Sequence, residues 1–173
     1  LSRRREFGLD ISRKHAFDPL KFHAITSIAL LGLIQLVIYI LWMGAAHSIY
    51  VQTFGDALPD SFTGFAQDVL FTSAGWQLIF FGSAVGFLFA VVVLTISAIS
   101  FPMLLHRDCG VFLAIQTSIQ VAIVNPKTML VWGVIVVSGL FLGAIPLFIG
   151  LAVVMPVLGH ATWHLYRAAV ADE

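Results

Sequence analysis

Charged residues are scarce in this sequence. They account for 10% of its 173 residues, whereas hydrophobic residues account for 60%. A water-soluble domain carries about 25% charged residues, so this composition excludes an ordinary soluble protein and predicts one that resides in lipid. The nine Lys and Arg are balanced by nine Asp and Glu. A chain without net charge gives no indication of nucleic-acid binding.

Patterns that carry chemistry are also missing. There is no GxSxG, HExxH, Walker or dinucleotide-binding motif. The single cysteine, Cys109, cannot form an intrachain disulfide or complete a redox or zinc motif. We therefore expect a protein that is not an enzyme and has no cofactor. No signal-peptide pattern opens the sequence at Leu1, and we expect it to be the C-terminal part of a longer chain.

Long stretches without charge are what the sequence does contain. About 20 apolar residues cross the roughly 30 Å of hydrocarbon in a bilayer. By this measure the sequence predicts an all-α integral membrane protein with four transmembrane helices, at residues 23–46, 76–100, 128–142 and 146–166. Apolar residues at spacings of three and four predict two further, interfacial amphipathic helices, at residues 61–71 and 108–124.

The cations of the sequence gather in three segments, and four spans would put all three on one side of the membrane. Because Lys and Arg near span ends are retained in the cytoplasm, we expect both ends of this sequence to be cytoplasmic in a multi-pass protein of the bacterial inner membrane. The predicted organisation is a cytoplasmic basic segment, a single transmembrane helical bundle and a cytoplasmic tail, at residues 1–22, 23–167 and 168–173.

His160 and His164 form the most specific candidate site. Residues at positions i and i+4 of a helix project from the same face, and two imidazoles can hold one metal ion. Two histidines do not complete a zinc or copper shell, so His106, Cys109, water or a partner chain would have to complete it. Alternatively, one histidine would bind haem with a partner on another helix. The alternative is a pair of interfacial histidines that bond loop carbonyls and lipid headgroups.

Two glycine pairs have the spacing that allows transmembrane helices to approach closely. They are Gly82 with Gly86, and Gly139 with Gly143. This spacing predicts helix packing, either within the chain or with a partner. By contrast, no Asp, Glu, Lys or Arg lies in a predicted span, which disfavours proton-coupled transport.

Several segments together resemble a known family: Ser97–Asp108, Thr117–Ser118, Asn125–Pro126, Trp132 and Pro156–Arg167. They are similar to the domain-of-unknown-function 2189 family of proteobacterial multi-span inner-membrane proteins, some of which are labelled as cytochrome c oxidase subunits. The resemblance implies a multi-span membrane protein with earlier spans before the basic run near Leu1. It also leads us to expect an acidic residue where this chain has His106.

Three functions remain open from the sequence. The leading hypothesis is a non-enzymatic accessory or assembly subunit that packs in the lipid bilayer against partner subunits of a larger respiratory or photosynthetic complex. The first alternative is a small-solute channel or transporter, which the polar residues Gln35 and Gln77 and the prolines near helix ends favour. The second is a haem- or metal-binding membrane protein that uses His160 and His164.

Overall fold

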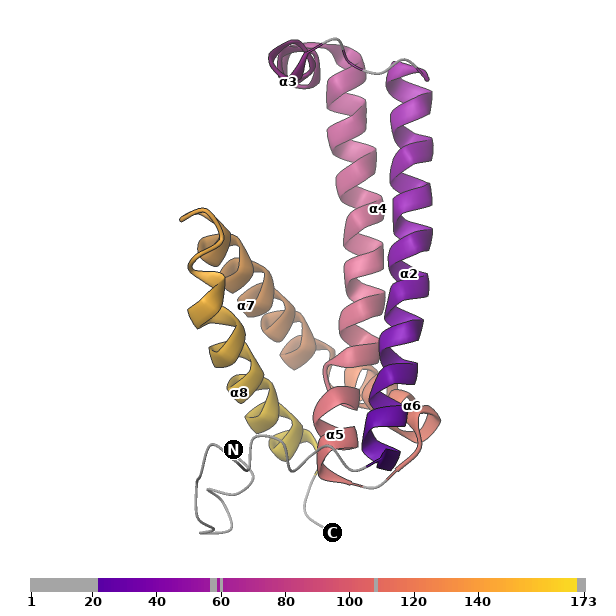
Figure 1. Cartoon of the computed structure of the whole chain (residues 1–173), viewed down its shortest axis with the longest axis vertical. Coiled ribbons are helices and arrows are strands. Elements are labelled where there is room, and N and C mark those ends of the chain that lie inside the picture. The colour runs from indigo at the N-terminus through magenta and orange to yellow at the C-terminus, as the bar shows by residue number, and fades with distance from the viewer. Residues whose placement is uncertain (1–21, 57–58, 60, 108, 171–173) are drawn as a thin grey trace. The chain divides into compact units, whose positions relative to one another are not determined.

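The computed structural model describes residues 22–56, 59, 61–107 and 109–170, and every regular element within them is an α-helix (Figure 1). The helices, labelled as in Figure 1, are α2 (Phe22–Phe54), α3 (Phe62–Phe71), α4 (Ser73–Ser97), α5 (Ser100–His106), α6 (Val111–Val124), α7 (Pro126–Ala144) and α8 (Leu151–Ala169). The predicted all-α class is confirmed. The basic segment before residue 22 and the last three residues of the predicted tail lie outside the described residues.

The chain forms two compact units. The first, which we call the long-helix unit, is Leu33–Val93 and contains most of α2 and α4 with α3 between them. The second, which we call the terminal unit, combines the start of α2, up to Gly32, with all described residues from Leu94 onward. Each unit has its own packing, and we describe them separately.

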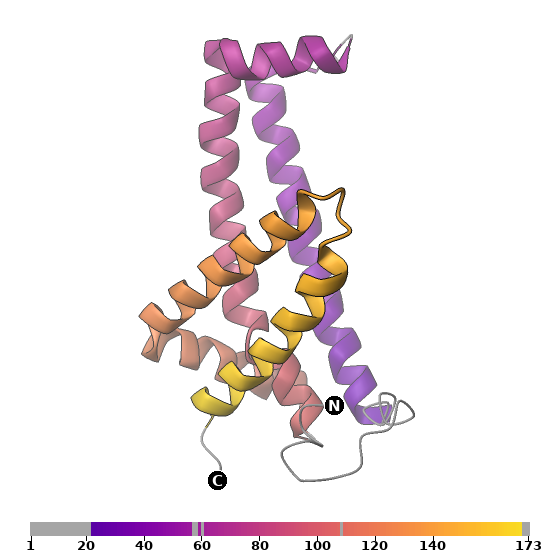
Figure 2. The same ribbon diagram turned by 90° about the vertical axis from the view of Figure 1, so that its left-hand side faces the viewer.

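In the long-helix unit, α2 and α4 are antiparallel and α3 lies crosswise to α4 (Figure 2). The α2 helix ends at Gly55, whose φ of 82° is a left-handed conformation that glycine adopts without strain. The Ser61 hydroxyl caps α3 by accepting a hydrogen bond from the Gly64 amide at 3.1 Å. The predicted interfacial helix at 61–71 is thus confirmed as a helix, and Phe65 packs its ring against Phe54 of α2.

In the terminal unit, α7 and α8 form an antiparallel hairpin (Figure 2). Small residues line its closed end: a Cβ on Gly143 would lie 2.8 Å from Leu151 Cδ2, and a Cβ on Gly150 would lie 2.8 Å from the Gly143 carbonyl oxygen. The buried core of the unit comprises Leu31, Ile99, Met103, Leu104, Ala114, Trp163 and Tyr166. The helices α5, α6 and α8 therefore meet around one apolar centre.

The Ser118 side chain of α6 inserts into the backbone hydrogen bonding where the helix is interrupted between α4 and α5. The Ile99 amide donates a hydrogen bond to Ser118 Oγ at 3.2 Å, and this hydroxyl donates to the Thr95 carbonyl oxygen at 2.6 Å. In an uninterrupted helix the Ile99 amide would bond the Thr95 carbonyl directly. Insertion of a hydroxyl into that bond bends or interrupts a helix. Pro102, which lacks an amide hydrogen, follows within the first turn of α5.

Three helical segments are long and apolar enough to cross a membrane, judged by length and composition: Ile25–Phe54, Ser73–His106 and Pro126–Ala144. They correspond to the first three predicted spans. The fourth, α8, has 19 residues like α7, but polar and aromatic residues from His160 to Arg167 make it less apolar. That α8 spans the membrane stays a prediction.

Several predicted boundaries were wrong. The last predicted helix was expected to begin at Pro146, but Leu147 and Phe148 have positive φ values of 49° and 65°, and α8 begins at Leu151. The interfacial helix predicted from 108 begins at Val111 because Gly110 is extended. The first helix continues to Phe54, and the left-handed conformation of Gly55 ends it there.

Candidate functional site

The candidate site is centred on the buried phenol of Tyr166, which is hydrogen-bonded to a histidine of another helix. Tyr166, near the end of α8, is only 1% exposed. Its hydroxyl lies 2.8 Å from Nδ1 of His106, the last residue of α5, and the tautomer of the imidazole decides which group donates. This hydrogen bond between a half-buried histidine and a buried tyrosine holds the end of α5 against α8. Leaving either buried group without a partner would lower the stability of the folded protein.

Three rings pack around this hydrogen bond. His106 meets the ring of Trp163 edge-on, with centroids 5.4 Å apart and planes at 87°. The Trp163 and Tyr166 centroids are 5.6 Å apart, because residues three apart on α8 lie on the same helix face. Such edge-to-face contacts contribute about 0.5–1.5 kcal/mol each beyond burial. We call His106, Trp163 and Tyr166 the aromatic triad.

Two arginines border the aromatic triad. Arg107 directly follows α5, and Arg167 lies in the last turn of α8. Tyr166 lies beyond the three segments that are long and apolar enough to cross a membrane. Burial raises the pKa of the Tyr166 phenol, while the positive charges of Arg107 and Arg167 act in the opposite direction. The phenol is therefore protonated at neutral pH, and it can both donate and accept a hydrogen bond.

The N-terminal part of the chain carries the family relationship. A family model described as "Predicted integral membrane protein (DUF2189)" matches residues 1–106. The chain belongs to this family. The match ends at His106, so it includes the α5 side of the aromatic triad, whereas Trp163, Tyr166 and the resembling segment Pro156–Arg167 lie beyond it. No curated protein and no solved structure matches the chain.

Membership of this family supports an integral membrane protein whose apolar helices contact lipid. The family description names no reaction, ligand or partner. The chemistry of the candidate site must therefore be argued from its own residues.

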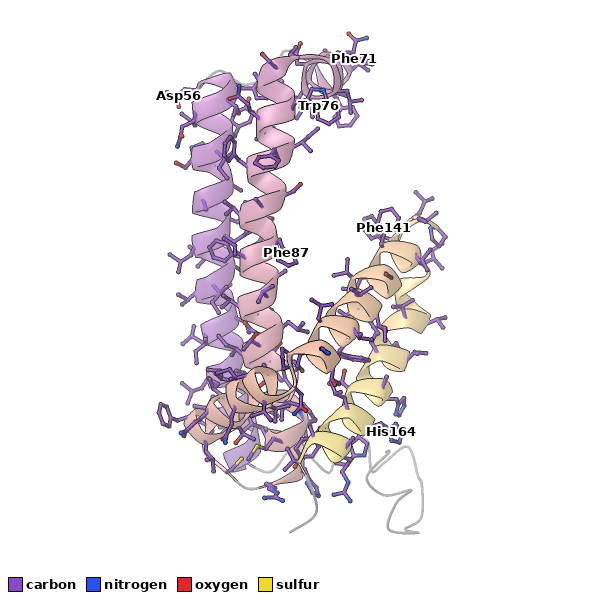
Figure 3. All side chains as sticks on the ribbon, turned by 180° about the vertical axis from the view of Figure 1, so that it is seen from behind. Asp56, Phe71, Trp76, Phe87, Phe141 and His164 are labelled. Carbon is purple, nitrogen blue, oxygen red and sulfur yellow. The ribbon has the colours of Figure 1, made fainter. Side chains whose placement is uncertain are left out.

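The structure places the predicted metal ligands on a different side of α8 from the triad. His160 and His164 are both exposed, whereas Trp163 and Tyr166 are buried. Figure 3 shows His164 on the outer side of the helix. Within residues 22–56, 61–107 and 109–170, no group of three or more His, Cys, Asp or Glu is placed to hold a metal ion. His106, one of the possible further ligands, has its Nδ1 at 2.8 Å from the Tyr166 hydroxyl. Metal binding by these two histidines stays a prediction.

The two glycine pairs have different surroundings. A Cβ on Gly139 would lie 3.4 Å from Val154 Cγ1, and one on Gly143 would lie closer to α8, at 2.8 Å from Leu151 Cδ2, so this pair lies in the interface of the α7–α8 hairpin. A Cβ on Gly86 would lie 3.7 Å from Trp42 Nε1 of α2, and one on Gly82 would meet no atom of the described chain within 4 Å.

Sequence reasoning missed both the aromatic triad and the Ser118 bridge. His106 and Tyr166 are 60 residues apart, and the local sequence around either residue does not predict their contact. One signal was available: Trp163 and Tyr166 are two aromatic residues at a spacing of three, which predicts that they share one face of a helix.

Proposed function

We propose that this chain is a non-enzymatic accessory or assembly subunit that packs against a larger complex of the bacterial inner membrane, of the respiratory or photosynthetic kind. The observation that carries the proposal is how little of its apolar surface the chain covers itself. In the most apolar stretch of α4 no residue is buried, and in those of α2 and α7 only 6% and 17% are. Lipid or partner helices must cover the rest.

Polar side chains on this apolar surface favour partner helices over lipid alone. Gln77 and Ser83 of α4 are both exposed. A polar group that faces hydrocarbon lacks the hydrogen bonds it makes in water, and such groups often bond a neighbouring helix. A helix from another subunit that covers the exposed side of α4 at Gln77 would give this side chain a partner.

Extraction in a mild detergent followed by native electrophoresis tests the proposal. We expect the protein to migrate with other subunits, and Gln77→Leu to weaken this association about threefold or more, because hydrogen bonds between membrane helices contribute about 0.6 kcal/mol on average. Gln52→Leu is the matched control, since Gln52 is an exposed glutamine on α2 that bonds Ser48 within its own helix. Migration of the wild-type protein alone would contradict the proposal.

One observation favours a small-solute channel or transporter as the second candidate. Gln35 Oε1, on α2, is buried and has no hydrogen-bond partner in the part of the chain that the structure describes. Buried polar atoms are normally paired, and a carbonyl oxygen between membrane helices can bond a passing solute. Solute release from liposomes that contain the purified protein, compared with Gln35→Leu, would separate the two functions.

A further inference from the structure

Two arginines lie next to the hydrogen-bonded pair His106 and Tyr166 of the terminal unit. Arg107 directly follows His106 at the end of α5, and Arg167 directly follows Tyr166 in the last turn of α8, so the 2.8 Å contact between His106 Nδ1 and the Tyr166 hydroxyl brings the backbones of the two arginines close together. The Arg107 amide donates to the Met103 carbonyl oxygen at 2.8 Å, which fixes its backbone at the end of α5. Both arginines remain partly exposed.

The position of Arg107 along the chain sets its depth. The apolar stretch that ends at His106 has 34 residues, more than the about 20 that a bilayer requires, and it is interrupted between α4 and α5. Arg107 is the first cation after the predicted span at 76–100, and cations that closely follow a span lie at the level of the lipid headgroups. Because Tyr166 touches His106, Arg167 on the next residue of α8 is held near the same depth. Trp163 and Tyr166 are also residue types that are common at this interface.

The frame that carries the two arginines is rigid. Tyr166 is 1% exposed and Trp163 is 8% exposed, and both rings pack on His106. Because the two arginines are attached to packed helices, less conformational entropy is lost when a ligand orders their side chains. Guanidinium is suited to such a ligand because its planar fork donates two parallel hydrogen bonds to phosphate oxygens.

We propose that Arg107 and Arg167 together bind the phosphate group of an anionic membrane lipid. A lipid is favoured over free phosphate because apolar side chains that are close to Arg107 in the sequence are exposed and can contact acyl chains. Leu105, two residues before Arg107, is 43% exposed, and Phe112 at the start of α6 is 79% exposed. Basic sites between membrane helices bind anionic headgroups in this way.

Thermal stability of the full-length protein provides the test. Protein in phosphatidylcholine vesicles is compared with protein in vesicles that also contain phosphatidylglycerol, for the wild type and for Arg107→Gln, Arg167→Gln and the double variant. We expect phosphatidylglycerol to stabilise the wild type, and each single variant to need about fivefold more phosphatidylglycerol for the same effect, which corresponds to about 1 kcal/mol per arginine near the surface.

Lys127→Gln is the matched control, because Lys127 is an exposed cation of the same unit at the start of α7. An equal loss in Lys127→Gln would overturn the site, since only overall charge would matter. A wild type that phosphatidylglycerol does not stabilise would overturn it as well, and equal stabilisation by inorganic phosphate would overturn the lipid assignment. If the glutamine variants do not fold, Arg107→Lys and Arg167→Lys keep the charge but lose the fork. Wild-type affinity in both lysine variants would refute the paired phosphate contact.

Discussion

Replacement of Ser118 by alanine removes the hydroxyl that bridges the break between α4 and α5. Ser118 is completely buried, and its oxygen accepts from the Ile99 amide and donates to the Thr95 carbonyl oxygen. Without it, both backbone groups lose their partner in a site that water does not reach. A buried group left unpaired costs about 1–3 kcal/mol. If the helix re-forms the direct bond between Thr95 and Ile99, the cost falls toward the lower end of that range, and the bend at this point is reduced.

The assay is unfolding of the protein in mixed micelles, with hydrogen exchange of the Ile99 amide as a local readout. We expect Ser118→Ala to be destabilised by about 1–3 kcal/mol and its Ile99 amide to exchange faster. The control is Thr117→Ala on the same helix, because the Thr117 hydroxyl bonds only the Leu113 carbonyl oxygen of its own helix at 2.9 Å. The control should change stability by less than about 0.5 kcal/mol. Equal stability of Ser118→Ala and Thr117→Ala would refute the bridging role.

Four further outcomes are expected. Gly75→Ala should destabilise the long-helix unit by about 1–3 kcal/mol, because a Cβ there would overlap the carbonyl oxygens at the end of α3; unchanged melting would contradict this packing. Tyr166→Phe should cost about 1–2 kcal/mol through loss of the hydrogen bond to its histidine partner, as measured by unfolding in micelles. Cys109 should react with a membrane-impermeant thiol reagent only after spheroplasts are lysed, and labelling of intact spheroplasts would reverse the predicted orientation. Metal analysis and absorption spectra of the purified protein should show no stoichiometric metal or haem at His160 and His164, and a signal that His164→Ala abolishes would establish the metal-binding alternative.

The sequence was sufficient to predict where the apolar helices lie, because burial in lipid requires long runs without charge. Residues 23–46, 76–100 and 128–142 fall within α2, within α4 and its continuation, and within α7. The ends were harder, since hydropathy does not report where a helix stops. The extension of α2 to Phe54 follows from the conformation of Gly55, which is a local backbone feature.

The break after Ser97 could not be predicted from the apolar pattern. The run from Ser73 to His106 is continuous in composition, and Pro102 lies after the break rather than at it. The deciding contact comes from Ser118, which is 19 residues beyond Ile99. A serine on α6 has the same sequence signature whether it faces solvent or completes a hydrogen bond of another helix, so only the folded chain distinguishes the two.

Which face of α8 is buried was also difficult to predict from the sequence. The second half of this helix has polar or aromatic residues on several faces, so polarity alone cannot indicate which face is inward. A spacing of four favoured His160 with His164 as the site, whereas the spacing of three between Trp163 and Tyr166 was not used. The contact with α5 shows which face of α8 is inward: His106 on α5 bonds the buried Tyr166, whereas both candidate metal ligands are exposed. A polar face of a membrane helix is therefore better assigned by asking which buried group on another helix it can satisfy than by its own spacing.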